Sequence, residues 1–276
     1  MTQLSRARSF LFVPGNRPER FAKALASGAD AVIIDLEDAV PLDAKDTARD
    51  ALLVAWSGLD AAERARLLVR VNPAGTPWHA ADLTAVASLS GLGAVMLPKA
   101  ENAQQIENTF RASDVPVLPL IESAEGVGQM DGIARAQGVL RLGLGHIDLQ
   151  ADLGMRCGPD EAELAPIRVA LIVASRRAGL PTPVDGVTTA TTDAEVLARD
   201  AQRSRRFGFG AKLCIHPAQV AGVHQALAPT EAECDWARRV LAAELAAGGG
   251  AFSVDGKMVD PPVLLLARKI LQLSQR

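Results

Sequence analysis

Short apolar runs rich in β-branched residues recur along the chain, and almost every one ends in a charged or chemically useful residue. The pattern predicts eight strands, near residues 10–14, 31–36, 67–72, 94–98, 116–121, 140–145, 183–187 and 211–216. Helix-like segments lie between them, and this alternation is typical of a parallel sheet with right-handed crossovers. Eight such units indicate an α/β fold that closes into a (β/α)8 TIM barrel.

The crossover helices are predicted from the spacing of apolar residues. Ala48, Ala51, Leu52 and Ala55 fall on one face of a helix that starts near Asp43. Pro18 suits the first turn of a helix over 18–27. Further helices are expected over 78–89, 102–112, 124–136, 163–178 and 192–207.

The last part of the chain does not fit the barrel pattern. A helix over 231–247 is followed by Gly248, Gly249 and Gly250, which predict a flexible joint. Residues 251–254 and 257–259 predict a hairpin around an Asp-Gly turn, and a closing helix is expected over 263–273. We therefore expect a barrel domain over 1–228 and an extension over 229–276 that serves as a lid or interface arm. A plain packing extension is the alternative.

Composition narrows the class of protein. The 276 residues suit one barrel, and a net charge of −3 argues against a general nucleic-acid binder. No apolar run approaches the roughly 18 residues of a membrane span. The first apolar run stops at Pro14, too short for a signal peptide. Three cysteines without a C-x-x-C spacing favour a reducing, cytoplasmic location.

Glu122 and Asp148 are the strongest candidates for a metal site. They follow the fifth and sixth predicted strands, whose carboxyl ends would be neighbours at the face where barrel enzymes place their chemistry. Two carboxylates without a Cys or His ligand pattern suit Mg²⁺ or Mn²⁺, with waters and substrate completing the coordination. Structural ion pairs are the alternative for both residues.

Arg70 ends the third predicted strand, where a buried arginine needs a partner. Its guanidinium could hold a carboxylate or carbonyl oxygen of a substrate. Glu37 and Asp38 follow the second strand, and we expect them to bind waters of the metal or to anchor Arg70. Structural pairing with an arginine is the expected role for at least one of them.

Three further residues carry alternative chemistry. Lys99 follows the fourth strand and could form a Schiff base if burial lowered its pKa, although the acids expected nearby would favour its charged form. His146 and His216 could exchange protons, but neither has a metal-ligand spacing. A structural role is the simpler interpretation for both histidines.

Several motifs together resemble the citrate lyase beta-subunit-like branch of the HpcH/HpaI aldolase family, which comprises CoA-thioester carbon–carbon lyases on a β/α barrel. The motifs are Phe12–Phe21, Asp35–Asp38, Val69–Asn72, Gly75–Trp78, Leu97–Glu101, Ile121–Ala124, Ile215–Pro217 and Met258–Pro261. Each motif alone is weak. Their order and spacing, from about Arg8 to the C-terminal helix, make the resemblance specific.

The resemblance implies roles for matching positions. Glu122 and Asp148 match the Mg²⁺ ligands, and Arg70 matches the arginine that contacts substrate oxygens. Asp260 matches an acid on the C-terminal arm, which in relatives closes over a neighbouring subunit's active site. The segment that binds coenzyme A corresponds to the one holding Arg17, Phe21 and Lys23.

One position departs from the family pattern. Relatives usually carry Gly-Ala-Glu-Asp after the sixth strand, where this chain has Gly145, His146, Ile147 and Asp148. The ligand Asp is kept, but Ile147 replaces the Glu before it. We expect this change to alter substrate choice or activity, or His146 to take over part of the lost polar role.

These features predict a Mg²⁺-dependent lyase that cleaves a 3-hydroxyacyl-CoA thioester of the citryl, malyl or citramalyl type. The products would be acetyl-CoA, or a close analogue, and a 2-oxo acid, and the reaction could be reversible. A homo-oligomer such as a trimer is expected from an arm that acts between subunits. The alternatives are a metal-dependent aldolase on free 2-oxo acids, and a non-catalytic barrel that works with the partner subunits of a citrate lyase.

Overall fold

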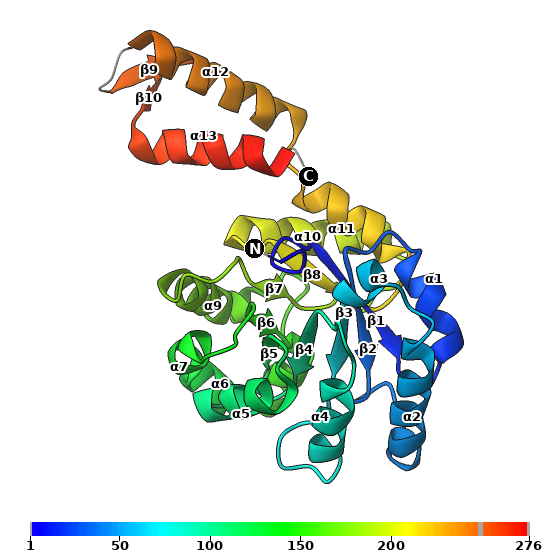
Figure 1. The fold of residues 1–276 in the computed structure, drawn as a ribbon. Coiled ribbons are helices and arrows are strands. Elements are labelled where there is room, and N and C mark those ends of the chain that lie inside the picture. The colour runs from blue at the N-terminus through cyan, green and yellow to red at the C-terminus, as the bar shows by residue number, and fades with distance from the viewer. Residues whose placement is uncertain (1, 248–250, 275–276) are drawn as a thin grey trace. The chain divides into compact units, whose positions relative to one another are not determined.

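Eight parallel strands form a closed barrel in which each strand pairs with the next along the chain and β8 pairs with β1 (Figure 1). This computed structural model describes residues 2–247 and 251–274. The strands are β1 (Ser9–Pro14), β2 (Ala31–Asp35), β3 (Leu67–Arg70), β4 (Ala94–Leu97), β5 (Val117–Ile121), β6 (Gly143–Leu144), β7 (Val184–Asp185) and β8 (Ala211–Cys214). The predicted (β/α)8 barrel is confirmed.

Helices surround the strands on the outside of the barrel (Figure 1). The α-helices of this part are α1 (Phe21–Leu25), α2 (Lys45–Trp56), α3 (Ala61–Ala65), α4 (His79–Ala87), α5 (Ala103–Ser113), α6 (Ala124–Gly128), α7 (Met130–Arg135), α8 (His146–Asp152), α9 (Ala165–Arg177), α10 (Ala194–Phe207) and α11 (Gln219–Leu227). Short 3-10 turns η1 (Pro18–Arg20), η2 (Leu42–Ala44) and η3 (Ala162–Leu164) lead into α1, α2 and α9.

Four differences from the sequence prediction concern helices. The single helix expected over 124–136 is divided into α6 and α7 at Gln129, in a segment whose glycines weaken a continuous helix. Helices α3, α8 and α11 were not predicted. Of these, α8 matters most because it starts directly after β6 and carries Asp148 into the site.

The barrel interior is apolar in its middle and closed at its amino-terminal end. Phe10, Ile33, Leu68 and Leu118 belong to one buried cluster contributed by several strands. Below it the buried guanidinium of Arg141 donates hydrogen bonds to the carbonyl oxygens of Leu4 (3.2 Å) and Ala7 (2.7 Å). The polar strand ends gather at the opposite, carboxyl-terminal end.

The chain divides into two compact units, Met1–His224 and Gln225–Arg276. The boundary expected at 228 follows the last residue of α11, whereas this division falls within that helix. The second unit contains α12 (Glu231–Ala247), β9 (Phe252–Val254), β10 (Lys257–Val259) and α13 (Pro261–Ser274), and β9 and β10 form an antiparallel hairpin. Ala237, Val240 and Ala267 are among the residues of its own buried core. The joint expected at Gly248–Gly250 lies outside the described residues.

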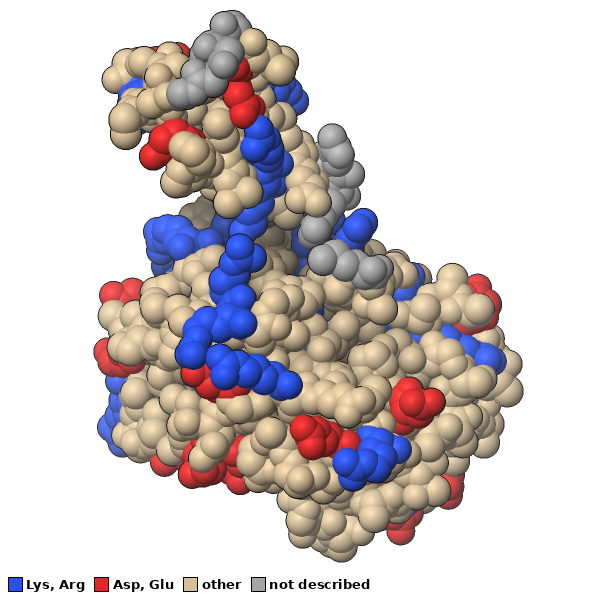
Figure 2. Space-filling view, turned by 60° about the vertical axis from the view of Figure 1, so that its left-hand side comes forward, with Lys and Arg blue, Asp and Glu red and all other residues tan. Residues whose placement is uncertain are grey.

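Basic and acidic side chains lie in neighbouring groups among uncharged residues on the surface that Figure 2 shows. Ion pairs also join neighbouring helices, such as that of Arg177 on α9 with Asp131 on α7. In the described ranges, no helix is both long enough and apolar enough to cross a membrane.

Candidate active site

The carboxyl ends of the barrel strands surround a cavity of about 450 Å³. Six of the residues singled out in the sequence line it: Asp38, Arg70, Glu122, His146, Ile147 and Asp148. They come from three different strand ends and from α8, so the closure of the barrel brings together residues that lie far apart in the chain. This is the face at which β/α barrels carry out their chemistry.

Arg70 is held by Asp35, its neighbour in register on β2. The Nε and Nη2 atoms of Arg70 donate to the two carboxylate oxygens of Asp35 at 2.7 and 2.6 Å. The guanidinium also lies 4.8 Å from the ring centroid of Phe12. Burial alone would lower the pKa of Arg70, but the nearby carboxylates raise it, so Arg70 stays charged. The bidentate edge of its guanidinium is occupied by Asp35.

Glu37 and Asp38 pair with the remaining side of the same guanidinium. Nη1 of Arg70 lies 2.7 Å from Glu37 Oε2, as an ion pair, and donates to Asp38 Oδ2 at 3.3 Å. Burial raises the pKa of Glu37 to about 7; Arg70 opposes this shift, and Asp38 and Asp35 add to it. Both acids therefore pair with Arg70, which is one of the two roles that the sequence suggests for them.

Glu122 lies at the end of β5 and is buried, with 3% of its surface exposed. Its Oε1 accepts a hydrogen bond of 2.8 Å from the backbone N–H of Lys99, whose φ of 47° is in the left-handed region. Burial raises the pKa of Glu122 to about 8, and the negative charges of Glu37 and Asp148 act in the same direction. A cation at this carboxylate would relieve that electrostatic cost.

Gly145 makes room for the Glu122 carboxylate. A Cβ atom at position 145 would lie 2.1 Å from Glu122 Oε2 and 2.7 Å from its Cβ. The next turn of chain then places half-buried Asp148 in the first turn of α8, on the wall of the same cavity. Gly145 was not singled out by the sequence prediction, because its role depends on the packing of β6 against β5.

The donor set fits Mg²⁺ better than a transition metal. Across the described residues, no group of three or more His, Cys, Asp and Glu side chains could hold a metal. Mg²⁺ is commonly bound through one or two carboxylates, with water and substrate oxygens as the other ligands. Glu122 and Asp148 are the residues that would hold it.

His146 belongs to a buried polar network beneath the cavity wall. Its Nε2 lies 3.6 Å from Glu161 Oε1, and Arg168 and Arg203 pair with the other oxygen of Glu161. Burial lowers the pKa of His146, which keeps the ring neutral. The network supports the start of α8, and Glu161 was missed because it comes from the loop between α8 and η3.

Lys99 and His216 do not enter the cavity lining. The side chain of Lys99 is exposed, so it lacks the desolvation that a Schiff-base lysine needs. His216 is exposed after β8, where its Nδ1 accepts a hydrogen bond from the backbone of Ala218 at 3.2 Å.

The predicted coenzyme A segment follows β1, at the same end of the barrel. Arg17 and Lys23 are exposed, and Arg17 pairs with Glu19 at 2.6 Å. Phe21 is 2% exposed and packs into the protein, which leaves its ring little surface for a ligand. Asp260 lies in the second unit, where its Oδ1 accepts a hydrogen bond from the backbone N–H of Val263 at the start of α13.

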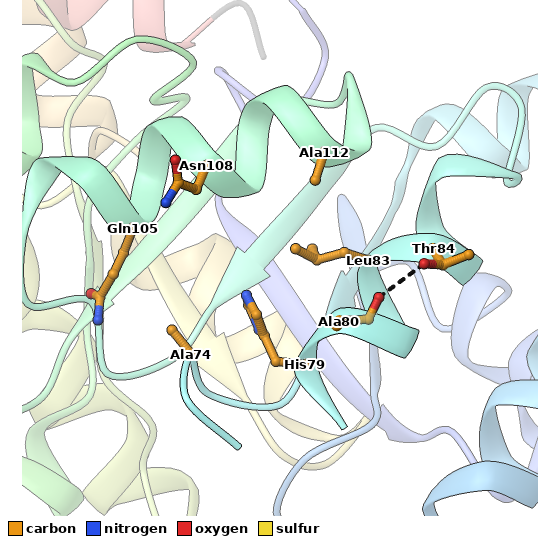
Figure 3. Close-up of a pocket in the computed structure, with 8 residues that line it drawn as sticks. All are labelled: Ala74, His79, Ala80, Leu83, Thr84, Gln105, Asn108 and Ala112. Carbon is orange, nitrogen blue, oxygen red and sulfur yellow. Dashed lines mark hydrogen bonds between the residues drawn. The ribbon is translucent and has the colours of Figure 1, made fainter. Parts of the chain in front are cut away.

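A second cavity, of about 380 Å³, lies between α4 and α5 on the flank of the barrel (Figure 3). His79 points into it from α4, and Gln105 and Asn108 face it from α5. Nδ1 of His79 lies 2.7 Å from the carbonyl oxygen of Asn72. The described residues of this lining include no Asp, Glu, Lys or Arg, so the charged cavity remains the candidate active site.

Comparison with known proteins found similar sequences over most of the chain. A sequence model of the HpcH/HpaI aldolase/citrate lyase family matches residues 8–217. A citrate lyase subunit beta-like protein of Deinococcus radiodurans is 39% identical over 96% of both chains. A (3S)-malyl-CoA thioesterase of Cereibacter sphaeroides is 36% identical over 97% of this chain and 94% of its own.

The fold comparison extends over nearly the whole chain. The crystal structure of protein CitE from Mycobacterium tuberculosis in complex with magnesium, acetoacetate and coenzyme A has a TM-score of 0.87. That protein is 38% identical, and the match covers 99% of this chain and all of the other.

Proposed function

The chain belongs to the HpcH/HpaI aldolase/citrate lyase family, and we propose that it is a Mg²⁺-dependent carbon–carbon lyase acting on a 3-hydroxyacyl-CoA thioester. The products are acetyl-CoA, or a close analogue, and a 2-oxo acid. The observation that carries the proposal is the convergence of buried Glu122, half-buried Asp148 and the anchored Arg70 in one cavity at the carboxyl end of the barrel.

The side chains divide the work of the reaction. Glu122 and Asp148 would hold Mg²⁺, which would supply a Lewis acid for the oxygens of the substrate. The hydroxyl group gives up its proton to solvent, and Arg70 stabilises the resulting alkoxide. The carbon–carbon bond then breaks as the alkoxide becomes the keto group of the 2-oxo acid and the electron pair passes to the thioester enolate. Asp35, Glu37 and Asp38 keep the Arg70 guanidinium oriented and charged.

Asp260 completes this proposal from the second unit. It gives a proton to the enolate carbon of the departing thioester, which becomes acetyl-CoA. Its place at the start of α13, on a unit with its own core, suits an acid presented on a rigid element. The corresponding assembly is a homo-oligomer such as a trimer, in which the arm of one subunit serves another.

Coenzyme A binding is assigned to the segment after β1. The exposed cations Arg17 and Lys23 suit the phosphates of the cofactor. The buried ring of Phe21 packs α1 against the rest of the protein. A reducing, cytoplasmic location fits the three cysteines, all of which are free thiols.

Product analysis tests the function directly. The purified chain is incubated with Mg²⁺ and citryl-, malyl- or citramalyl-CoA, and acetyl-CoA, free CoA and the 2-oxo acid are measured separately. We expect acetyl-CoA and the oxo acid in equal amounts from at least one thioester, with loss of turnover in Glu122→Gln. Free CoA without acetyl-CoA would instead indicate thioester hydrolysis and refute the lyase.

Calorimetric titration separates the two alternatives. Acetyl-CoA binding should strengthen when Mg²⁺ and a 2-oxo acid are present, and Lys23→Glu should weaken it. Binding of Mg²⁺ and oxo acid without any response to CoA would favour an aldolase on free 2-oxo acids. Absence of binding to all three would favour a non-catalytic barrel that needs partner subunits.

A further inference from the structure

The walls of the active-site cavity differ sharply in chemistry from one side to the other. Arg70, Glu122 and the acids around them come from β2, β3 and β5. The opposite side, built by β6, β7, β8 and the segments that follow them, carries His146 and Asp148 at the start of α8. Its other large side chains are aliphatic: Leu144, Ile147, Val187, Leu213 and Ile215. We call these five residues the aliphatic wall.

The aliphatic wall presents surface that a bound molecule can contact. Ile147 is 46% exposed and Ile215 is 39% exposed, although both line a concave site. When an apolar group of a ligand covers exposed aliphatic side chains in a cavity, apolar surface is removed from water and binding is stabilised. A methyl or ethyl group on the substrate is such a group.

Positive charge in the cavity is confined to one place. Arg70 is the one lysine or arginine among the described residues that line it, and its guanidinium already pairs with Asp35, Glu37 and Asp38. His146 also contributes to the lining, but it is buried beside Arg168 and faces Glu161. One substrate carboxylate could bind to Mg²⁺ held by Glu122 and Asp148. A second carboxylate placed on the aliphatic wall would find no cation there.

We propose that the lyase selects substrates whose 2-oxo acid fragment carries a single carboxylate and a short apolar substituent on the aliphatic wall. This inference rests on the proposed function and narrows it. The 2-oxo acid is then pyruvate or 2-oxobutyrate rather than oxaloacetate, because a second carboxylate would lose its water against aliphatic carbon without gaining a partner. Glyoxylate has no substituent and leaves the aliphatic wall uncovered.

A series of 2-oxo acids tests this selection. With Mg²⁺ and acetyl-CoA, glyoxylate, pyruvate, 2-oxobutyrate and oxaloacetate are compared by kcat/KM for formation of the 3-hydroxyacyl-CoA and by calorimetric binding. We expect pyruvate and 2-oxobutyrate to exceed glyoxylate by about 10-fold and oxaloacetate by about 100-fold. Equal or better use of oxaloacetate would overturn the inference and leave the lyase intact. No binding of any of the four acids would overturn the proposed function itself.

Two variants place a cation on the aliphatic wall. Ile147→Lys and Ile215→Lys introduce it at positions that are already partly exposed, so the fold should tolerate them. Each should raise the ratio of oxaloacetate to pyruvate binding by about 10-fold. An unchanged ratio in both variants would overturn the assignment of the substituent to this wall. Val169→Lys, at a half-exposed position on α9 outside the cavity, is the matched control and should leave the ratio unchanged.

Lys99 provides the remaining check, because it is the exposed cation that follows β4. It is absent from the described lining of the cavity, yet its charge acts on Glu37. The proposal predicts that Lys99→Gln leaves the preference for pyruvate over oxaloacetate unchanged. A selective loss of oxaloacetate binding in this variant would show that the cavity does offer a second carboxylate site, and would overturn the inference.

Discussion

Arg70 on β3 and Asp35 on β2 are paired in register, and the guanidinium donates to both oxygens of the carboxylate at 2.7 and 2.6 Å. Both side chains are buried, so the pair is fixed before any substrate binds. This arrangement orients the remaining donors of Arg70 and limits how far they can adapt. It makes Asp35 a positioning residue for the proposed reaction.

Replacement of Arg70 should therefore reduce catalysis strongly. Arg70→Ala should lower kcat/KM for carbon–carbon cleavage of the 3-hydroxyacyl-CoA by about 10²–10³, the usual loss when one donor to a developing oxyanion is removed. Arg70→Lys should also be impaired, because an ammonium group cannot donate in parallel to both oxygens of Asp35. Near-normal turnover in either variant would contradict the assigned role.

Folding has to be measured in the same variants. Arg70→Ala leaves the carboxylate of Asp35 buried without its partner, which can destabilise a protein by about 3–5 kcal/mol. Urea unfolding therefore accompanies the kinetics, and only folded protein is compared. Arg111→Ala, at an exposed position on α5, is the control and should retain both activity and stability.

Gly145 offers a test of the metal site in which both proposed ligand residues, Glu122 and Asp148, are retained. Gly145→Ala puts a Cβ where the Glu122 carboxylate lies, 2.1 Å from Oε2, so that carboxylate must move. We expect the affinity for Mg²⁺, measured by calorimetry, to fall by about 10–100-fold. Gly128→Ala, at a helical glycine with open space around it, should leave Mg²⁺ binding unchanged. Equal affinities in the two variants would argue against Glu122 as a ligand.

Metal binding should depend on pH through Glu122. Burial raises the pKa of this carboxyl group to about 8 when no metal is bound, so it is largely protonated at neutral pH. Mg²⁺ requires the carboxylate, and binding then releases a proton. The affinity should rise by up to about tenfold per pH unit below pH 8 and level off above it.

Calorimetry in two buffers with different heats of ionisation measures this proton directly. The wild-type chain should release up to one proton per Mg²⁺ at pH 7, and much less at pH 9. Glu122→Gln should bind Mg²⁺ weakly and without that release. A pH-independent affinity between pH 6.5 and 8.5 would contradict the linkage.

The strand ends were the part of the site that the sequence made predictable. Arg70 and Glu122 directly end or follow apolar runs, and a closed parallel barrel necessarily brings such positions to one face. Asp35 also ends such a run, but its role depends on the register of β2 against β3, which apolar periodicity does not specify. The role of Glu161 could not be predicted, because this residue lies in a loop whose sequence has no apolar periodicity.

Local packing accounts for the other differences. Phe21 stands in a segment that resembles a coenzyme A site, yet its ring is buried because α1 uses it to pack onto the protein. The short helix α8 could not be predicted from the sequence, because it follows β6 without an intervening turn segment. Such features depend on contacts between elements, which a single sequence does not reveal.

Asp260 raises the question of which subunit it serves. The proposed function assigns it to the protonation of the enolate, and its unit has its own core. Asp260→Asn should reduce turnover while Mg²⁺ binding by Glu122 and Asp148 remains unchanged, because the amide cannot give up a proton in this way. Weaker Mg²⁺ binding in this variant would point to a structural effect instead.

Mixing two inactive variants distinguishes action within a subunit from action between subunits. Arg70→Ala and Asp260→Asn each lack one component of the proposed site, and the two chains are unfolded together and refolded as a mixture. If the acid acts on a neighbouring subunit, about a quarter of the sites in a random oligomer combine an intact Arg70 with an intact Asp260. Activity should then return to about that fraction of wild type. If each arm serves its own barrel, every site keeps one lesion and the mixture stays inactive, which would refute the proposed exchange between subunits.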